Sequence, residues 1–415
     1  MLLRFRVENV RSLRDEQELS FAVPEGESGY AERLVALSDG RELALYPTLG
    51  ILGGNASGKS NVLAALRLMK EAVLSSYGAW TSYDGLPREP YALDPGAAAK
   101  SCFWEADFVL GDGVRWTYGF ELGESRVEGE WLHAYPKGRR QVWFDREAGR
   151  PKEFEFPGER LQDRTRLART TRPNALLLSR AAADNHPQLG RVFDWFKKLW
   201  DIDPESERQQ REAFTTRQLA DGKARHRIEE LLRVADLGIE STELEQRPGR
   251  PPVVKLRHTS AQGGGTIEWE RESFGTRSWY ALLGPVLRAL DEGAVLLVDE
   301  LDSSLHPRMA AEVVRLFQRP QTNPRNAQLI FTSHDSSLLG EPGGGRLLAV
   351  GQIWLTEKDA DGATRVFPLS DFEPGEEEDL TSSYLTGVFG GVPRLSEGQV
   401  GRRLLMADAM EVSGS

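Results

Sequence analysis

Apolar and polar residues alternate at the start of the chain, as they do in a half-buried β-strand. In "LLRFRVENVRSL" the apolar positions include Leu3, Phe5 and Val7, and "ELSFAV" at residues 18–23 has the pattern of a partner strand. "TLGILG" at residues 48–53 predicts a short buried strand. From Cys102 to about residue 145 the alternation returns with many aromatic residues and turns at residues 111–113. These segments predict a β-rich layer.

Helical spacing of apolar residues follows the buried strand. Residues 61–75 carry apolar side chains on one helical face, at Val62, Leu66, Met69 and Val73. A longer helical block is predicted between about residues 158 and 237, for example in "GRVFDWFKKLW" and "HRIEELLRV". This block is too short to form a long coiled-coil arm.

The last third of the chain predicts alternating strands and helices. "VVKLRH" and "TIEWE" have strand patterns and join through three glycines at residues 263–265. A helix, a strand, a helix and a strand follow, up to Thr332. A hairpin then joins "QIWLTEK" to "TRVFPL" through a turn at residues 359–362. The tail after residue 394 is weakly patterned, and we expect it to be mobile.

Composition narrows the class of protein. The 415 residues exceed one small domain, and 40% hydrophobic with 28% charged residues is ordinary for a globular chain. The sequence has neither an 18-residue apolar run nor a charged-then-apolar leader, so we expect no membrane span and no signal peptide. A single cysteine, Cys102, excludes an internal disulfide and is typical of a reducing cytoplasm. The net charge of −11 argues against nucleic-acid binding over the whole surface.

The stretch "GGNASGKS" at residues 53–60 has the pattern of a phosphate-binding loop. Its glycines allow consecutive backbone N–H groups to surround phosphate oxygens, and the helix that follows directs its positive end at the same anion. Lys59 is predicted to reach the β- and γ-phosphates, and the Ser60 hydroxyl to ligate Mg²⁺. The predicted nucleotide-binding residues are Gly53, Asn55, Ala56, Ser57, Gly58, Lys59, Ser60 and Asn61.

Hydrolysis also requires a carboxylate for the metal and a group that positions water. "AVLLVDE" at residues 294–300 has five apolar residues in a row, as in a parallel strand covered on both faces, and then two carboxylates. Side chains at that end of a parallel strand emerge where α/β sheets bind ligands. We therefore predict that Asp299 holds Mg²⁺ through water and that Glu300 polarises the attacking water. The alternative is an acidic corner between a strand and a loop.

A histidine follows the next predicted strand. "QLIFTSHD" places His334 after an apolar run, and one amphipathic helix separates this run from Glu300. One crossover makes the two strands possible neighbours in the sheet, so His334 can contact the γ-phosphate. A histidine after a strand is structural in most proteins, and only the neighbouring motifs favour a catalytic role for this one.

The order of these motifs resembles the ABC-type ATPase heads of the RecF, SMC and OLD class. "LLVDELDSSLHP" followed by "IFTSHD" looks like their extended Walker B, a D-loop at residues 301–305 and a switch histidine. "ESFGTRSWYALL" looks like a variant of their signature motif, in which Phe274 replaces one glycine. The resemblance implies that Ser273, Gly275 and Thr276, with Asp302 of the D-loop, contact ATP bound by a second subunit.

Further stretches resemble one bacterial group in particular. "LLRFRVENVRSLRDEQELSF", "RPNALLLSRAA" and "YLTGVFGGVP" are similar to AAA/ABC ATPases of abortive-infection and phage-defence operons. Genes of that group often lie beside RloB-type or other TOPRIM-like nucleases. The resemblance implies a homodimer or higher oligomer around ATP and Mg²⁺ that senses or regulates a separate effector, a nuclease or toxin.

The expected fold is therefore α/β, a P-loop head of ABC-ATPase type with a mixed sheet, a β-rich layer and an inserted helical subdomain. We divide the chain into an N-terminal ATPase lobe (1–155), the helical insertion (156–250), a C-terminal ATPase lobe (251–393) and the mobile tail (394–415). The Q-loop glutamine and an aromatic residue to stack on adenine could not be assigned.

Two other functions compete with the regulator. Basic residues at 137–140, 160–172 and 223–227 could form a nucleic-acid groove in a RecF-like repair ATPase, although salt-bridged solvent faces are the more common use of such residues. An ATP-gated scaffold with incidental turnover is the non-enzymatic alternative. Asp359 and Asp361 formally match a TOPRIM metal pair, but too few residues follow them for that domain, and Asp-Gly here predicts a hairpin turn.

Overall fold

The computed structural model describes residues 1–24, 32–80, 85–202, 208–235, 238–247, 250–259, 263–303, 305–340, 345–392, 398–399 and 401–404. Ser304 of the predicted D-loop and most of the tail expected to be mobile lie outside this range. Within the described part of the chain, no helix combines the length and apolar character that a membrane span requires.

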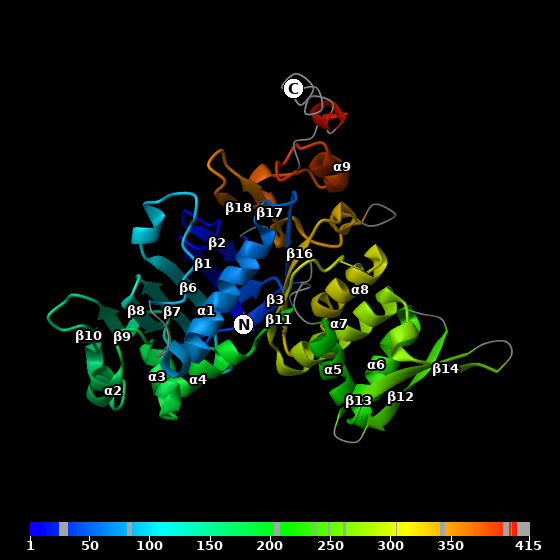
Figure 1. Ribbon diagram of the computed structural model, residues 1–415. Helices are drawn as coiled ribbons and strands as arrows, with labels where there is room; N and C mark the ends of the chain where they lie inside the picture. Colours follow the sequence, from blue (N-terminus) through cyan, green and yellow to red (C-terminus); the bar gives the residue numbers. More distant parts are fainter. Residues whose placement is uncertain are drawn as a thin grey trace, which may run out of the picture.

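Two large sheets form the frame of the molecule (Figure 1). One is antiparallel and has the spatial order β10 (Phe154–Glu155), β9 (Gln141–Glu147), β8 (Val127–Ala134), β7 (Arg115–Leu122), β6 (Cys102–Val109), β1 (Leu2–Glu8) and β2 (Gln17–Ser20). The other is mixed and has the order β11 (Leu199–Ile202), β15 (Val295–Val298), β16 (Gln328–Ser333), β5 (Thr48–Gly53), β17 (Ile353–Lys358) and β18 (Thr364–Pro368). Only β18 runs antiparallel in the mixed sheet.

Smaller sheets and the helices complete the described fold. β12 (Ile239–Arg247), β13 (Arg250–His258) and β14 (Gly265–Ile267) form one small sheet, and β3 (Arg33–Ala36) pairs with β4 (Glu42–Leu45). The helices are α1 (Lys59–Ala79), α2 (Arg164–Thr170), α3 (Leu177–Ala183), α4 (Pro187–Lys197), α5 (Arg208–Gln218), α6 (Gly222–Ala235), α7 (Phe274–Glu292), α8 (Pro307–Gln318) and α9 (Leu380–Leu385).

The mixed sheet separates two hydrophobic cores because its strands are buried on both faces. Val295, Leu297 and Ile330 point into the core shared with the antiparallel sheet, α1, α3 and α4. Leu296 and Leu329 point into the core shared with α7, α8 and the small β12–β14 sheet. Side chains alternate between the faces of a strand, so the unbroken apolar runs predicted from the sequence supply both cores. The predicted adjacency of β15 and β16 is confirmed.

The helical block expected at residues 156–250 is divided by the structure. Leu199–Ile202, at the end of "GRVFDWFKKLW", is not helical but forms β11, which pairs in parallel with β15. α2–α4 lie beside α1 and the antiparallel sheet, whereas α5 and α6 lie against α7 at the other end of the molecule (Figure 1). The boundary expected at residue 250 falls inside the β12–β13 hairpin. Pairing with a strand about 95 residues away is a non-local event that periodicity does not report.

One buried carboxylate attaches the helices α2–α4 to the antiparallel sheet. Glu130 of β8 accepts hydrogen bonds from the backbone N–H groups of Leu177 (2.6 Å) and Leu178 (3.0 Å), at the start of α3, and from the Tyr118 hydroxyl (2.9 Å). Arg146 lies 3.8 Å from the same carboxylate, and both side chains are fully buried. The segment "RPNALLLSRAA" therefore has a structural role at this junction.

One predicted strand ends earlier than expected, and one predicted hairpin is confirmed. The strand predicted in "TIEWE" ends at Ile267, and Trp269–Arg271 form a 3₁₀ turn because the Trp269 indole turns inward and donates to Glu212 (3.0 Å). The hairpin at residues 359–362 is confirmed. Asp359 Oδ1 accepts the backbone N–H groups of Asp361 (2.9 Å) and Ala363 (2.8 Å) inside that turn.

Candidate nucleotide-binding site

The phosphate loop joins β5 to α1 and has a backbone that only certain residues tolerate. Gly58 has φ 106° and Ala56 has φ 61°, both in the left-handed region. A Cβ atom on Gly58 would lie 2.0 Å from Thr364 Oγ1, and one on Gly53 would lie 2.3 Å from Thr356 Oγ1. Both glycines are therefore needed for close approach to the β17–β18 hairpin, and Gly58 also for its φ value.

Lys59 is buried at the start of α1 and turns back onto its own loop. Its Nζ donates to the carbonyl oxygens of Gly53 (2.8 Å) and Gly54 (3.0 Å) and lies 3.2 Å from His334 Nδ1. Burial lowers the pKa of Lys59 to about 8, against the opposing effect of nearby acidic side chains. A phosphate group at the loop would favour the charged form of this lysine.

Ser60 and Asp299 meet across two elements that are distant in sequence. The Ser60 hydroxyl, on the first turn of α1, donates to Asp299 Oδ1 at 3.1 Å. Thr332, at the end of β16, donates a hydrogen bond to the same Oδ1 atom and accepts one from the backbone N–H of Glu300 (2.7 Å). Thr332 thereby holds both carboxylate residues in place, and the sequence analysis did not single it out.

Glu300 and His334 form the next pair. Glu300 has φ 50°, which directs its side chain away from the strand axis, and its Oε1 lies 3.5 Å from His334 Nε2. Asp302 accepts the backbone N–H of His334 at 3.3 Å. The structure therefore brings Lys59, Glu300 and His334, the three predicted catalytic residues, to one edge of the sheet.

Two of the predicted nucleotide-binding side chains support the loop instead. Ser57 Oγ is 2.6 Å from Thr356 Oγ1, and the Asn61 amide donates to Ser12 Oγ (2.6 Å). Thr364 completes this support, since its hydroxyl donates to the Ser57 carbonyl oxygen (2.9 Å) and contacts Ser12 Oγ (2.8 Å). The backbone N–H groups of Ser57 and Asn61 are also engaged within the loop, with the carbonyl oxygens of Gly54 (3.1 Å) and Gly58 (3.0 Å). Ser12, Thr356 and Thr364 come from the two ends of the chain, and no local motif marks them.

A small cavity of about 170 Å³ lies beside the Ser60–Asp299 pair. Arg11 and Arg67 line it together with Asp201 of β11. Arg11 is held by Glu89, whose carboxylate oxygen is 2.5 Å from Arg11 Nε. The N-terminal turn thus places a guanidinium next to the Walker B carboxylates, which the sequence analysis missed.

The predicted signature residues lie on a different part of the surface from the phosphate loop. Ser273 caps α7 by accepting the Thr276 N–H at 3.0 Å, and Ser273, Gly275 and Thr276 line a separate cavity with Leu305 and Met309. Phe274 is 56% exposed, with the Arg208 guanidinium 4.7 Å from its ring centre. The phosphate loop and the signature residues of one chain therefore do not share a pocket.

The oxygen atoms at Ser60 and Asp299 suit magnesium. Hydroxyl and carboxylate oxygens are its preferred protein ligands, and it commonly keeps several waters and phosphate oxygens besides one or two protein groups. No cluster of three His, Cys, Asp or Glu side chains that could hold a metal occurs among the residues that the structure describes.

A family comparison covers this whole arrangement. Residues 49–340 match the family described as "AAA domain, putative AbiEii toxin, Type IV TA system", and this range holds the phosphate loop, Ser273, both Walker B carboxylates and His334. The chain belongs to this family. Its fold is that of a P-loop nucleotide-binding head, in which the phosphate loop joins β5 to α1 and β16 lies between β5 and β15.

Solved structures with similar chains include SMC and ABC proteins. The SMC head domain from Thermotoga maritima has 15% identity and a TM-score of 0.43, with 88% of this chain and 98% of that chain covered. An Smc head domain from Pyrococcus furiosus, bound to the C-terminal domain of ScpA, has 13% identity and a TM-score of 0.41 over 90% and 97% of the chains. CbiO1 from Clostridium perfringens has 11% identity and a TM-score of 0.30 over 90% and 91%. No curated protein matches the chain.

Proposed function

We propose that this chain is an ATPase that dimerises around ATP and Mg²⁺ and regulates a separate effector, a nuclease or toxin, in antiphage defence. The observation that carries the proposal is the meeting of Ser60 with Asp299 at 3.1 Å beside the Glu300–His334 pair. A metal-binding hydroxyl, a carboxylate, a base and a sensing histidine at the end of one phosphate loop are what phosphoryl transfer to water requires.

Each residue has a distinct part in the proposed reaction. The loop N–H groups and Lys59 would hold the β- and γ-phosphates, and Glu300 would orient and polarise the attacking water. Ser60 and Asp299 would hold Mg²⁺, which when bound offsets negative charge on the phosphates. His334, between Lys59 and Glu300, would contact the γ-phosphate and lose that contact when phosphate leaves.

A second copy of the chain would complete the site. Ser273 and the first turn of α7 present backbone N–H groups at a helix N-terminus, which attracts anions, but they lie in a pocket apart from the phosphate loop. A twofold arrangement would set each α7 against the other copy's nucleotide, with Asp302 at the same interface.

The effector follows from the resemblance rather than from the site, and the cytoplasmic setting rests on the single cysteine, Cys102. TOPRIM-like nucleases of the RloB kind are the partners that the resemblance implies. Purification of the native complex followed by a mass measurement would identify the partner. Isolation of the homodimer alone, from cells that carry the neighbouring genes, would contradict the effector part of the proposal.

The repair-ATPase alternative gains no support from the predicted basic cluster. Arg164 pairs with Glu159 (2.8 Å), Arg166 with Asp184 (3.4 Å), and Arg172 donates to the Tyr77 carbonyl oxygen (2.6 Å). Such residues are salt-bridged solvent faces or structural contacts more than phosphate ligands. DNA binding with a steep dependence on salt concentration would restore that alternative.

Two variants test the ATPase part. We expect Lys59→Ala to lose ATP binding, and Glu300→Gln to bind ATP but to release phosphate at least about 100-fold more slowly, with dimers that persist on ATP. Scattering-derived masses with and without ATP, together with phosphate release, measure both effects. Full biological function in Glu300→Gln would favour the scaffold alternative, and wild-type protein that fails to bind ATP would contradict every form of the proposal.

Mixing two inactive chains tests the composite site. Ser273→Arg damages the first turn of α7, and Lys59→Ala damages the phosphate loop. If the site forms in trans, a mixed dimer contains one intact site, and mixing restores part of the turnover. A mixture that remains as inactive as its components would contradict the trans arrangement but not ATP binding.

A further inference from the structure

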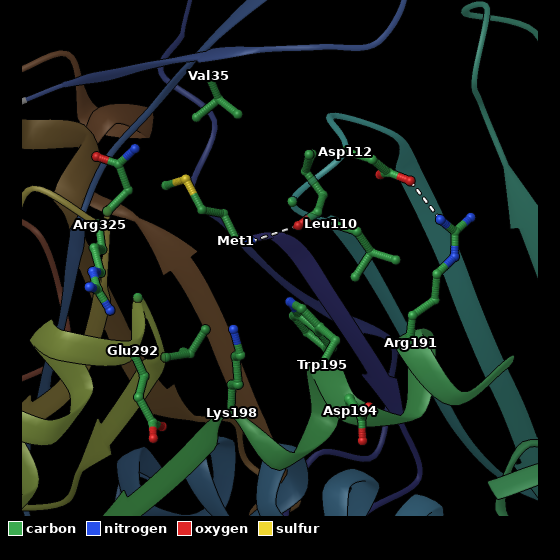
Figure 2. A pocket seen from close by; sticks show the side chains of 15 residues that line it. Met1, Val35, Leu110, Asp112, Arg191, Asp194, Trp195, Lys198, Glu292 and Arg325 are labelled. Carbon is green, nitrogen blue, oxygen red and sulfur yellow. Dashed lines mark hydrogen bonds and ion pairs between the residues drawn. The ribbon is translucent and has the colours of Figure 1, made fainter. Parts of the chain in front are cut away.

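A second, larger cavity lies at the opposite end of the parallel strands from the phosphate loop. Its volume is about 510 Å³, within the range of small-molecule sites. The start of β15, the β6–β7 turn, α4 and the end of α7 all contribute to its wall (Figure 2). None of the residues assigned to the nucleotide lines it.

The wall of this cavity is apolar over much of its surface. Val35, Val109, Leu110 and the Met1 side chain lie on one side, with Trp195 of α4 beneath them. The Trp195 ring stacks on Phe108 with centroids 4.1 Å apart, which keeps it in place. Together these side chains form a rigid surface on which an apolar ligand could pack.

The acidic side chains around the cavity have ion-pair partners, whereas two basic side chains have none among the described residues. Its three carboxylates each have a cationic partner: Asp112 pairs with Arg191 (2.6 Å), Asp194 with Lys197 (2.7 Å), and Glu292 with Arg288. Arg325 donates to the backbone carbonyl oxygen of Asp291 and has no carboxylate partner among the described residues. Lys198 forms no ion pair with any residue in the described part of the chain, and Figure 2 shows its ammonium group directed into the cavity.

We propose that this cavity binds a small organic anion, namely a carboxylate or comparable monoanionic group on an apolar body. The anion would contact Lys198, with Arg325 nearby, and the apolar body would pack on Trp195 and Leu110. A ligand of this chemistry supplies negative charge beside the unneutralised cations of the wall and covers the apolar surface that the wall exposes.

One helix, α7, connects the cavity to the proposed nucleotide site. Glu292 and Gly293 end α7 at the cavity, and the other end of α7 carries Ser273. Bound ligand would therefore contact the far end of the proposed signature helix. Ligand binding itself does not depend on the proposed ATPase function.

Binding of the fluorescent anion anilinonaphthalene sulfonate to the full chain, without nucleotide, tests the site. We expect one saturable site, from which octanoate displaces the probe and octylammonium, with the same apolar chain and the opposite charge, does not. Lys198→Met keeps the side-chain stem but removes the charge, and we expect it to weaken probe binding by about tenfold or more. Lys223→Met is the matched control, because Lys223 lies in α6 and does not line the cavity, and its affinity should equal that of the wild type.

A second variant tests the same cavity in case Lys198→Met does not fold. Leu110→Glu places a carboxylate in the cavity wall and should also abolish probe binding, while its thermal unfolding is checked separately. Wild-type affinity in Lys198→Met, or equal displacement by octylammonium, would overturn the proposal. Displacement by the peptide acetyl-Trp-Glu-Leu-amide but not by octanoate would also overturn it, since the occupant would then be a protein segment. Because nucleotide is absent throughout, none of these results bears on ATP hydrolysis.

Discussion

The hydroxyl of Thr332, at the end of β16, donates a hydrogen bond to the carboxylate of Asp299, at the end of the neighbouring strand β15. The same hydroxyl accepts the backbone N–H of Glu300 at 2.7 Å. One fully buried threonine therefore orients both residues that the proposed chemistry needs.

Replacement of Thr332 separates this orienting role from general stability. Thr332→Val keeps the shape of the side chain but removes both hydrogen bonds, and we expect a loss of about 1–3 kcal/mol in unfolding free energy. ATP turnover should fall as well, because Asp299 and Glu300 lose their common support. Thr332→Ser keeps the hydroxyl and should recover turnover. Urea unfolding and phosphate release measure the two effects, and equal turnover in Thr332→Val and wild type would exclude the orienting role.

Gly58 is predicted to tolerate no side chain. Gly58→Ala combines a φ of 106° with a Cβ that would lie 2.0 Å from Thr364 Oγ1, so the loop must shift. We expect ATP affinity to fall at least about tenfold. The control is Gly78→Ala in the same helix, where a Cβ meets nothing within 4 Å, and which should be neutral or stabilising by up to about 1 kcal/mol. Titration calorimetry measures the affinity of each variant for ATP. Wild-type affinity in Gly58→Ala would contradict this geometry of the loop.

Gly284 allows α5 and α7 to approach closely. Its backbone N–H donates to Thr215 Oγ1 at 3.2 Å, and a Cβ atom would lie 2.4 Å from that oxygen and 2.9 Å from Thr215 Cα. Gly284→Ala should therefore cost about 1–3 kcal/mol by overpacking. Gly190→Ala in α4 has open space around it and serves as the control. Thermal unfolding distinguishes the two, and equal stability of both variants would show that α5 moves freely relative to α7.

Turnover adds a second readout for the Gly284→Ala variant. Displacement of α5 would shift the signature helix while the phosphate loop, on the other side of the sheet, keeps its shape. We therefore expect ATP binding within about twofold of wild type and a lower rate of hydrolysis. Loss of ATP binding would mean instead that the damage reaches the loop.

Glu130 is predicted to be a large single contributor to stability. Glu130→Leu removes the acceptor of two backbone N–H groups of α3 and one of the two carboxylates beside the buried Arg146, which keeps Glu153 at 2.7 Å. We expect a loss of about 3–5 kcal/mol in unfolding free energy. The double variant Glu130→Leu with Arg146→Met should be less destabilised than the sum of the single variants, because each single variant already loses the contact between Glu130 and Arg146. Additive losses in denaturant unfolding would show that the pair is not coupled.

By itself the sequence determined the parts of this protein that depend on neighbours along the chain. The phosphate loop, the apolar strands that end in Asp299 or His334, and the hairpin at residues 359–362 each show a local pattern of spacing or turn chemistry. The mixed sheet with both faces covered follows from the same unbroken apolar runs, because such runs must be buried on two sides.

Only the tertiary structure decided which distant residues meet. β11 joins β15 across about 95 residues, so the expected helical block is divided, and "LWDI" carries no local sign of this pairing. Ser12 and Thr364 come from opposite ends of the chain to support the phosphate loop, and Thr332 joins the Asp299 carboxylate to the backbone N–H of Glu300. Hydroxyl side chains occur in strands for many reasons, so the sequence does not show which of them support a functional site. Their hydrogen-bond partners are set by the tertiary structure. Lys198 is ordinary in the sequence for the same reason, and it stands out only where the fold places it in a cavity with no counter-charge among the described residues.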